Sequence, residues 1–281
     1  MLGLDCFCRK KCQRAFIDTK CIIIDPVKRS HLVLDPFAKW IPGATYHVYN
    51  RAVALNKMFV VKRDHELFRE KLQRLKPYVE IYAIACVGTH FHMHVRIRTD
   101  AEIRRRLLAL RKLLNVQKRY LEGRETFQRL IGDAFGRSFQ AYARAFNLKY
   151  QRKGDLFNQT VRRLRVRDDL LSRRLCAYIH CQDIKHGLGE RVSGLGMKTS
   201  FEEIWRGKSS FIDVESVLAR FGGKEAFIEY HRIYSQRRRA VLKRFNEDRF
   251  FQYDQTNRDH SGKLPVWLLD RGEAYLNNLH R

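Results

Sequence analysis

VEIYAIACVGTHFHMHVRIR, residues 79–98, is the stretch that decides the fold. Val79, Ile81 and Ala83 before Gly88, and the histidines after it, recur with the period of two residues that is typical of β-strands. Gly88 lies at the break between the two patterns, so the stretch predicts a hairpin of two antiparallel strands. Residues i and i+2 of a strand point to one face. His90 and His92 should therefore project together, with Phe91 in the opposite layer.

The residues around the hairpin predict further strands and helices. TYHVYNRA, residues 45–52, alternates β-branched and aromatic residues and predicts a strand. Asp64 should cap a helix that Pro77 stops, and Asp100 should begin a helical region that continues past Gly123 to residue 146. Residues 156–166 predict an extended segment, and Asp168 and Asp169 begin a helix that runs to about residue 186. The order strand, helix, two strands, helices, strand, helix predicts an α+β sandwich, with helices packed on an antiparallel sheet.

We divide the chain into three parts. Residues 1–37 read as an N-terminal extension, residues 38–190 as the principal domain, and residues 191–281 as a basic helical C-terminal region. Within the last part we expect helices at 213–221 and 224–245, separated by a turn at Gly222-Gly223.

The composition predicts a soluble protein whose partner is a nucleic acid. It does not indicate which reaction, if any, the protein catalyses. There are 56 Lys and Arg against 30 Asp and Glu, a net charge of +26, and 44% of the residues are hydrophobic. That hydrophobic content supports a packed core and argues against wholesale disorder. No apolar run approaches the ~18 residues of a transmembrane helix, so we expect no membrane span. A polyanion is the expected partner, and nucleic acid is the first candidate.

The seven cysteines predict reduced thiols. Their odd number, in a chain whose start lacks the pattern of a secretory signal, favours a cytoplasmic protein. Four of them fall within residues 6–21, where a zinc site is conceivable. Their spacing differs from the paired C-x2-C of structural zinc sites, so we favour a loosely ordered segment.

Two short motifs bear side chains suited to phosphate chemistry. The imidazoles of His90 and His92 can share one divalent metal, or they can be ordinary histidines of a half-buried strand. Tyr178 and Gln182 are four residues apart and lie on one helical face. The Gln182 carbonyl could complete the metal site and Tyr178 could attack a phosphodiester, although a tyrosine packed on the sheet is the simpler reading. His94 shares the face of His90; we interpret it as a hydrogen-bonded core residue and leave it out of the metal set.

Taken together, these motifs resemble those of the single-tyrosine HUH transposases. THFHMHV (89–95) is similar to their His-hydrophobe-His strand, and YIHCQDIKHGL (178–188) to their tyrosine helix. Segments 46–52, 75–87, 149–163 and 221–232 resemble the chromosomal branch, the REP-associated tyrosine transposases. The chain departs from the family at Val87-Gly88-Thr89, where many relatives have Met-Pro-Asn, at Gln182-Asp183, where the chromosomal branch often has Asn-Pro, and at His94.

The resemblance implies a fold and a set of roles. It implies a ferredoxin-like antiparallel sheet, of the kind also found in RNA-recognition and palm domains, with the His-Phe-His strand central and a helical C-terminal extension. His90, His92 and Gln182 would bind Mg2+ or Mn2+, and Tyr178 would be the nucleophile. The activity implied is cleavage and rejoining of single-stranded DNA near hairpins or palindromic repeats, through a 5′-phosphotyrosine intermediate. Proposed DNA contacts are Asn50, Arg51, Arg162, Arg163, Arg165 and Lys185.

The position of the charge agrees with this interpretation. Residues 101–180 contain 20 Lys and Arg against 7 Asp and Glu, and we interpret this excess as the walls of a DNA channel. The main alternative is a non-catalytic ferredoxin-like nucleic-acid-binding protein, and a domesticated enzyme is a further one. The long segment 101–150 and the C-terminal region favour a monomer over a dimer. The expected location is the cytoplasm of a bacterium, with the nucleoid.

Overall fold

A computed structural model describes residues 37–158, 161–182 and 197–256, and the side chains of Leu55, Met197 and residues 241–256 lie outside this description. The N-terminal extension with its four cysteines therefore falls outside the described residues, as do the predicted boundary at residue 190 and Lys185. No helix of the described ranges combines the length and the apolar character needed to span a bilayer.

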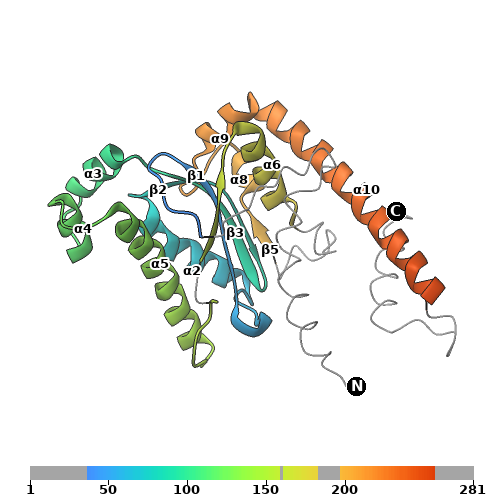
Figure 1. The fold of residues 1–281 in the computed structure, drawn as a ribbon, viewed down its shortest axis with the longest axis horizontal. Coiled ribbons are helices and arrows are strands. Elements are labelled where there is room, and N and C mark those ends of the chain that lie inside the picture. The colour runs from blue at the N-terminus through green and yellow to red at the C-terminus, as the bar shows by residue number, and fades with distance from the viewer. Residues whose placement is uncertain (1–36, 159–160, 183–196, 257–281) are drawn as a thin grey trace, which may run out of the picture.

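Five strands and eight α-helices make up the described part of the chain (Figure 1). The strands are β1 (Thr45–Arg51), β2 (Val79–Val87), β3 (His90–Ile97), β4 (Arg162–Val166) and β5 (Met197–Thr199). The helices are α2 (Lys62–Leu72), α3 (Asp100–Leu108), α4 (Asn115–Leu121), α5 (Phe127–Lys149), α6 (Asp169–His180), α8 (Phe201–Trp205), α9 (Val214–Phe221) and α10 (Lys224–Thr256). Short 3-10 turns at Val53–Leu55 and Gln73–Leu75 flank α2.

The sheet confirms the predicted α+β class. Its strand order is β4-β1-β3-β2-β5 and every pair of neighbours is antiparallel. Strands β1 to β4, joined by α2, by the β2–β3 hairpin and by α3 to α5, have the βαββαβ order of ferredoxin-like folds. Strand β3 is central, as the resemblance implies. The fifth strand comes from the C-terminal region, so residues 197–199 extend the same sheet.

The β2–β3 hairpin is as predicted, with Val87 opposite His90 across the two-residue turn of Gly88 and Thr89. Backbone hydrogen bonds hold this turn from two sides. The Ala52 N–H donates to the Thr89 carbonyl at 2.9 Å, and the Met58 N–H donates to the Gly88 carbonyl at 2.7 Å. The hairpin turn, from which β3 starts, is therefore hydrogen-bonded to the residues that follow β1.

Helix boundaries follow local capping, with some corrections. Asp168 is the N-cap of α6 and accepts from the Leu171 N–H at 2.7 Å. Asp64 is not an N-cap, because α2 begins two residues earlier; its carboxylate accepts from the N–H groups of Val60 and Val61. The last helix runs to residue 256 rather than 245, and α6 ends at His180, with residues 183–186 of the predicted helix outside the described ranges. We did not predict α4 as a separate helix, α8, or β5.

One face of the sheet is covered by α2 and α5 through an aromatic core. The Phe68 ring lies 5.1 Å from that of Phe91 and 4.9 Å from that of Tyr142, between ring centroids, and Phe91 lies 5.1 Å from Phe139. All four side chains are buried. Phe91 therefore faces this layer, as the strand alternation predicts, and leaves the opposite face to the histidines.

Phe68→Ala should destabilise the protein by about 3–5 kcal/mol, because the truncation removes buried ring contacts and leaves a cavity. We expect a lower Tm and a lower urea midpoint with an unchanged m-value. Leu148→Ala, on the exposed side of α5, is the matched control and should change stability by less than about 0.5 kcal/mol. Equal losses in the two variants would contradict this account of the core.

The other face of the sheet is covered by α6, which packs on β2 and β3, and α9 and α10 pack against α6 in turn (Figure 1). Gly222 and Gly223 both have positive φ, 84° and 119°, which lets the chain turn sharply between α9 and α10. The predicted turn is thereby confirmed. The first part of the C-terminal region is thus packed on the helix that carries Tyr178.

Candidate active site

Two strands present their polar side chains on the face that α6 covers. Strand register pairs Arg51 with His90, Tyr49 with His92, and His47 with His94. Paired residues of antiparallel strands point to the same side, so β1 and β3 together line one face with histidine, tyrosine and arginine. The prediction that His90 and His92 share a face opposite Phe91 is borne out by this register.

The structure brings Tyr178 to this face. The Tyr178 ring lies edge-on to His92, with 5.5 Å between ring centroids and an interplanar angle of 75°. The His90 and His92 rings are 5.1 Å apart. Because α6 runs over β2 and β3, a residue near its C-terminal end reaches the start of β3. The two motifs that are far apart in the sequence therefore meet in the fold.

His47 is a site residue that the sequence analysis missed. Its Nε2 lies 2.9 Å from Nδ1 of His92, in hydrogen-bond contact, and its ring lies 6.1 Å from that of Tyr178. Period-two alternation in TYHVYNRA could have placed His47 on a face with Tyr49. The sequence contains no signal, however, that β1 pairs with β3.

Hydrogen bonds to Nδ1 orient the rings of His90 and His92. Nδ1 of His90 lies 3.1 Å from Oγ1 of Thr89, and Nδ1 of His92 engages His47. A metal would therefore be bound through Nε2 of each ring. Partners of this kind on the second nitrogen are typical of metal-ligating histidines, because they set the tautomer and the ring orientation.

The side chain of Gln182, the third metal ligand predicted from the sequence, is buried and has an acceptor oxygen that a cation could use. Its Nε2 donates to the Tyr178 carbonyl at 3.0 Å. Within the described ranges its Oε1 has no hydrogen-bond partner, and a buried acceptor without a partner is unfavourable. A divalent cation would satisfy this oxygen. Two imidazole nitrogens and one amide oxygen thus fit an ion such as Mn2+ or Mg2+.

His94 belongs to the core beneath α6. Its side chain is buried, its Nε2 lies 3.3 Å from Oγ of Ser172 on α6, and its ring contacts Tyr82 edge-on. Burial, with a smaller effect from Arg220, lowers the pKa of His94 to about 3, so the ring is neutral at physiological pH. This arrangement matches the core interpretation made from the sequence.

The predicted DNA contacts separate into two groups. Arg51 and Arg162 lie on the histidine face, since Arg162 pairs with Tyr49 in the register between β1 and β4. Burial, and then the positive charge of Arg162, lowers the pKa of Arg51. Two cations held this close beside the His90 end of β3 favour an anion at this edge.

Three other predicted contacts, Asn50, Arg163 and Arg165, are not brought to this face. Arg163 and Arg165 pair with Val48 and Tyr46, so they project from the opposite side of β4. Arg163 donates to the carbonyls of Phe37 and Ala38, at 3.1 and 2.5 Å, and stacks over Trp40. Asn50 is buried, and its Nδ2 donates to the Asn158 carbonyl at 3.0 Å. Lys185 lies outside the described residues.

The basic residues of α3 and α4 do not form walls of this site. Helix α3 follows the far end of β3, about 20 Å from His90 at 3.3 Å per residue, and α5 covers the opposite face of the sheet. The alternation in the sequence of β3 did not decide which face of the sheet the helical segment after it covers, because a long helical segment can cross either face. The structure therefore does not bring the basic residues of α3 and α4 to this site, and the interpretation of the charge as one channel stays a prediction for the rest of residues 101–180.

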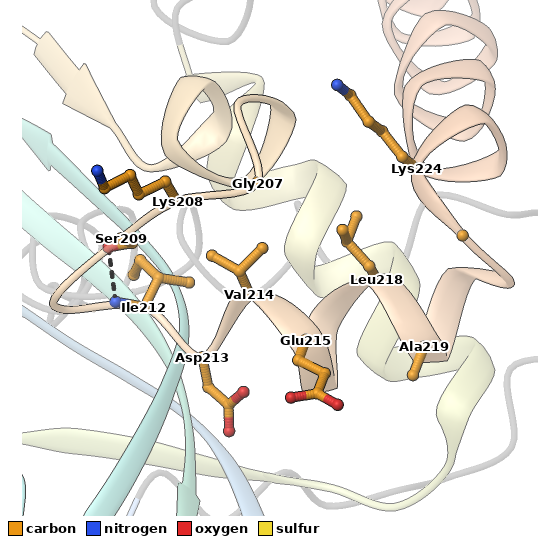
Figure 2. A pocket seen from close by; sticks show the side chains of 11 residues that line it. Gly207, Lys208, Ser209, Ile212, Asp213, Val214, Glu215, Leu218, Ala219 and Lys224 are labelled. Atoms are coloured by element: carbon orange, nitrogen blue, oxygen red, sulfur yellow. Dashed lines mark hydrogen bonds between the residues drawn. The ribbon is translucent and has the colours of Figure 1, made fainter.

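A surface hollow of about 710 Å3 lies elsewhere, between the segment 207–213, α9 and the start of α10 (Figure 2). Apolar side chains of Val214 and Leu218 form its floor, and Lys208, Glu215 and Lys224 lie around it. It contains none of the predicted site residues. The predicted site residues therefore lie at the sheet and not at this hollow.

Comparisons with known proteins give one weak similarity. No protein-family model matches the sequence, and no curated protein matches it with significance. A solved structure that matches is described as "Structure of the REP associates tyrosine transposase bound to a REP hairpin". It is 13% identical, with a TM-score of 0.39, and the match covers 63% of this chain and 90% of that one. A similarity of this size carries no weight for function, so the proposal below depends on the side chains of the site.

Proposed function

We propose that the protein is a metal-dependent endonuclease and strand transferase for single-stranded DNA, of the HUH single-tyrosine type. The observation that carries the proposal is the packing of Tyr178 on His92, 5.5 Å between ring centroids, beside His90. A phenol and a pair of metal ligands must meet at one phosphate for this chemistry. The carbonyl oxygen of Gln182, one turn beyond the tyrosine, supports the same site.

The exposure of the side chains indicates how DNA would approach. His92 and Tyr178 are buried, His90 and Arg51 are half-buried, and Arg162 is exposed. DNA would therefore enter from the edge where β3 begins, with Arg51 and Arg162 binding phosphates next to the scissile one. In this arrangement the arginines fix the position of the strand and contribute no base recognition.

The chemistry follows from these positions. A divalent ion held by His90, His92 and Gln182 would polarise a non-bridging oxygen of the scissile phosphate. The Tyr178 hydroxyl oxygen attacks phosphorus, the bond from phosphorus to the 3′ oxygen breaks, and the phenol proton is transferred so that the leaving group becomes a 3′-OH. The 5′-phosphotyrosine keeps the energy of the broken ester. The reverse attack by a 3′-OH then rejoins the strand without a nucleotide cofactor.

The covered sheet argues against the non-catalytic alternative. RNA-recognition modules bind unpaired bases on aromatic side chains of an open sheet face. Here α6 packs on β2 and β3, and α2 and α5 cover the other face. The central strand β3 is therefore covered on both faces. A hairpin-bearing strand as substrate, action as a monomer, and a location with bacterial chromosomal DNA remain parts of the proposal.

The test uses hairpin oligonucleotides with randomised single-stranded flanks, incubated with the protein and Mn2+. We expect an adduct that survives a denaturing gel. A 5′-phosphotyrosine leaves the 3′-labelled fragment on the protein and releases the 5′-labelled fragment with a free 3′-OH. The opposite label pattern, or no adduct from any flank, would contradict the proposal.

His47→Ala should weaken the use of metal without preventing DNA binding. With an ion on Nε2, the Nδ1–H of His92 donates to His47, so the loss of this acceptor frees the ring to rotate. We expect the Mn2+ concentration for half-maximal adduct formation to rise about 10- to 100-fold. Saturating Mn2+ should restore most of the rate, and the assay is a metal titration at fixed DNA.

Two variants control for a merely structural effect. His47→Gln retains an acceptor oxygen and should recover part of the metal affinity. His65→Ala removes an equally buried histidine that stacks on Phe59 in the other layer, so it should lower Tm without shifting the Mn2+ midpoint. An unchanged midpoint in His47→Ala would rule out a positioning role.

A further inference from the structure

A second group of metal-ligating side chains lies between α6 and α10. Cys176 and His180 are four residues apart on α6, and His231 projects from α10. The Cys176 sulfur lies 3.8 Å from Nδ1 of His180, which lies 2.9 Å from Nε2 of His231. Their ligand atoms all lie within 4.8 Å of one another, and all three residues are buried. In the described ranges no other three histidine, cysteine or acidic residues are grouped in this way.

Each imidazole is held by its other nitrogen. The Nδ1–H of His231 donates to the Phe227 carbonyl at 2.7 Å, and Nε2 of His180 lies 2.9 Å from Oγ of Ser200. The same hydroxyl accepts from the Ile84 N–H of β2 at 3.0 Å. These contacts direct Nδ1 of His180 and Nε2 of His231 toward each other and toward the thiol. Backbone carbonyls and hydroxyls orient the rings of metal-bound histidines in this manner.

The protonation states suit a metal with an affinity for sulfur. Burial, followed by His231, lowers the pKa of His180 well below its ordinary value, and burial lowers that of His231 to about 4. Both rings are therefore neutral, which is the form that binds metal. Burial raises the pKa of the Cys176 thiol, but a bound ion deprotonates a coordinating thiol.

The spacing requires little movement. A tetrahedral zinc ion with ligand nitrogens at about 2.0–2.1 Å holds those nitrogens about 3.3 Å apart. The observed 2.9 Å is the distance of a hydrogen bond, in which a single proton between the two rings takes the place of the ion. Two nitrogens and one sulfur favour zinc over the hard ions Mg2+ and Ca2+.

We infer that Cys176, His180 and His231 bind a zinc ion that fastens α10 to α6. The site is separate from the proposed nuclease site, which has no sulfur ligand, and it does not require Tyr178 to be catalytic. Tyr178 lies between Cys176 and His180 on α6, so an ion at this position would also hold the tyrosine helix against the C-terminal helix. In the sequence, residues 181–223 separate these two helices.

The experiment is a Co2+ titration of the full chain in which Cys6, Cys8, Cys12 and Cys21 are replaced by serine. We expect one equivalent of Co2+ to give a sulfur-to-cobalt charge-transfer band and tetrahedral d–d absorption, and Zn2+ to displace it. Zn2+, but not Mg2+, should raise Tm by a few degrees. The charge-transfer band reports only on a sulfur ligand, so failure here is distinct from failure of DNA cleavage.

Matched variants assign the ligands. Cys176→Ala should abolish the charge-transfer band, whereas Cys86→Ala, at another buried thiol on β2, should retain it. His231→Gln keeps α10 and should weaken Co2+ binding at least about tenfold, which provides a test if Cys176→Ala fails to fold. Absence of the band from the protein with Cys176 intact, its persistence in Cys176→Ala, or an unchanged Co2+ affinity in His231→Gln would overturn the assignment. The cluster would then be a hydrogen-bonded element of the core.

Discussion

Tyr178→Phe should abolish the protein–DNA adduct, with a loss of at least about 10³-fold in cleavage. The substitution removes the attacking oxygen and keeps the ring that packs on His92 and His47. Folding and DNA affinity should therefore remain close to those of the wild type. The measurement combines the denaturing-gel adduct assay with single-stranded DNA binding, both on the oligonucleotide that gives the strongest wild-type adduct.

Tyr49→Phe is the control that makes this result specific. Tyr49 is another tyrosine whose ring lies near His92, at 6.0 Å between centroids, on the same face of the sheet. If Tyr178 is the nucleophile, Tyr49→Phe retains the adduct, and mass spectrometry of the digested adduct places the nucleotide on the peptide with Tyr178. An adduct that persists in Tyr178→Phe would eliminate the proposed mechanism.

Removal of the proposed metal ligands should have the second largest effect. We expect His90→Ala and His92→Ala each to lower adduct formation at least about 10²-fold at fixed Mn2+, since an ion that stabilises phosphate charge contributes several kcal/mol. EDTA should abolish the wild-type reaction, and added Mn2+ should restore it. His90 is half-buried, so its substitution should leave Tm nearly unchanged.

A matched substitution separates metal binding from the loss of any histidine on this face. His94→Asn removes a third imidazole of β3, one that bonds to Ser172 and lies in the core, so it should lower stability more than it changes the Mn2+ requirement. Full activity of the wild type in EDTA, or of both alanine variants at limiting Mn2+, would show that no metal acts through His90 and His92.

The predictions that succeeded depend on local geometry. Alternation along residues 79–98 was sufficient for the hairpin and for the shared face of His90 and His92, because a strand places every second side chain on one side. Tyr178 lies near the end of α6, as predicted, but Gln182 lies beyond the last residue of that helix, His180, so the helical face predicted for the two residues is not confirmed. The start of α6 was predicted at Asp168 and Asp169, and Asp168 is its N-cap, because the first helical N–H groups need an acceptor.

Other features depended on which segments lie next to each other. His47 could be assigned to a face of its own strand, but only the pairing of β1 with β3 brings it to His92. Arg163 and Arg165 looked like neighbours of the tyrosine, yet the register of β4 directs them to the opposite layer. The spacing of Cys176 and His180 carried no signal for a metal, because the third residue of the cluster comes from α10.

The sequence by itself thus determined the class of fold, the faces of individual elements and the pair of motifs that bear histidine and tyrosine. The tertiary structure alone decided that these motifs meet, that His47 joins them, and that α10 completes a second cluster on α6. The reason is physical. Backbone periodicities of 2 and 3.6 residues are set within a few residues, whereas strand order and helix packing depend on burial of side chains from distant segments.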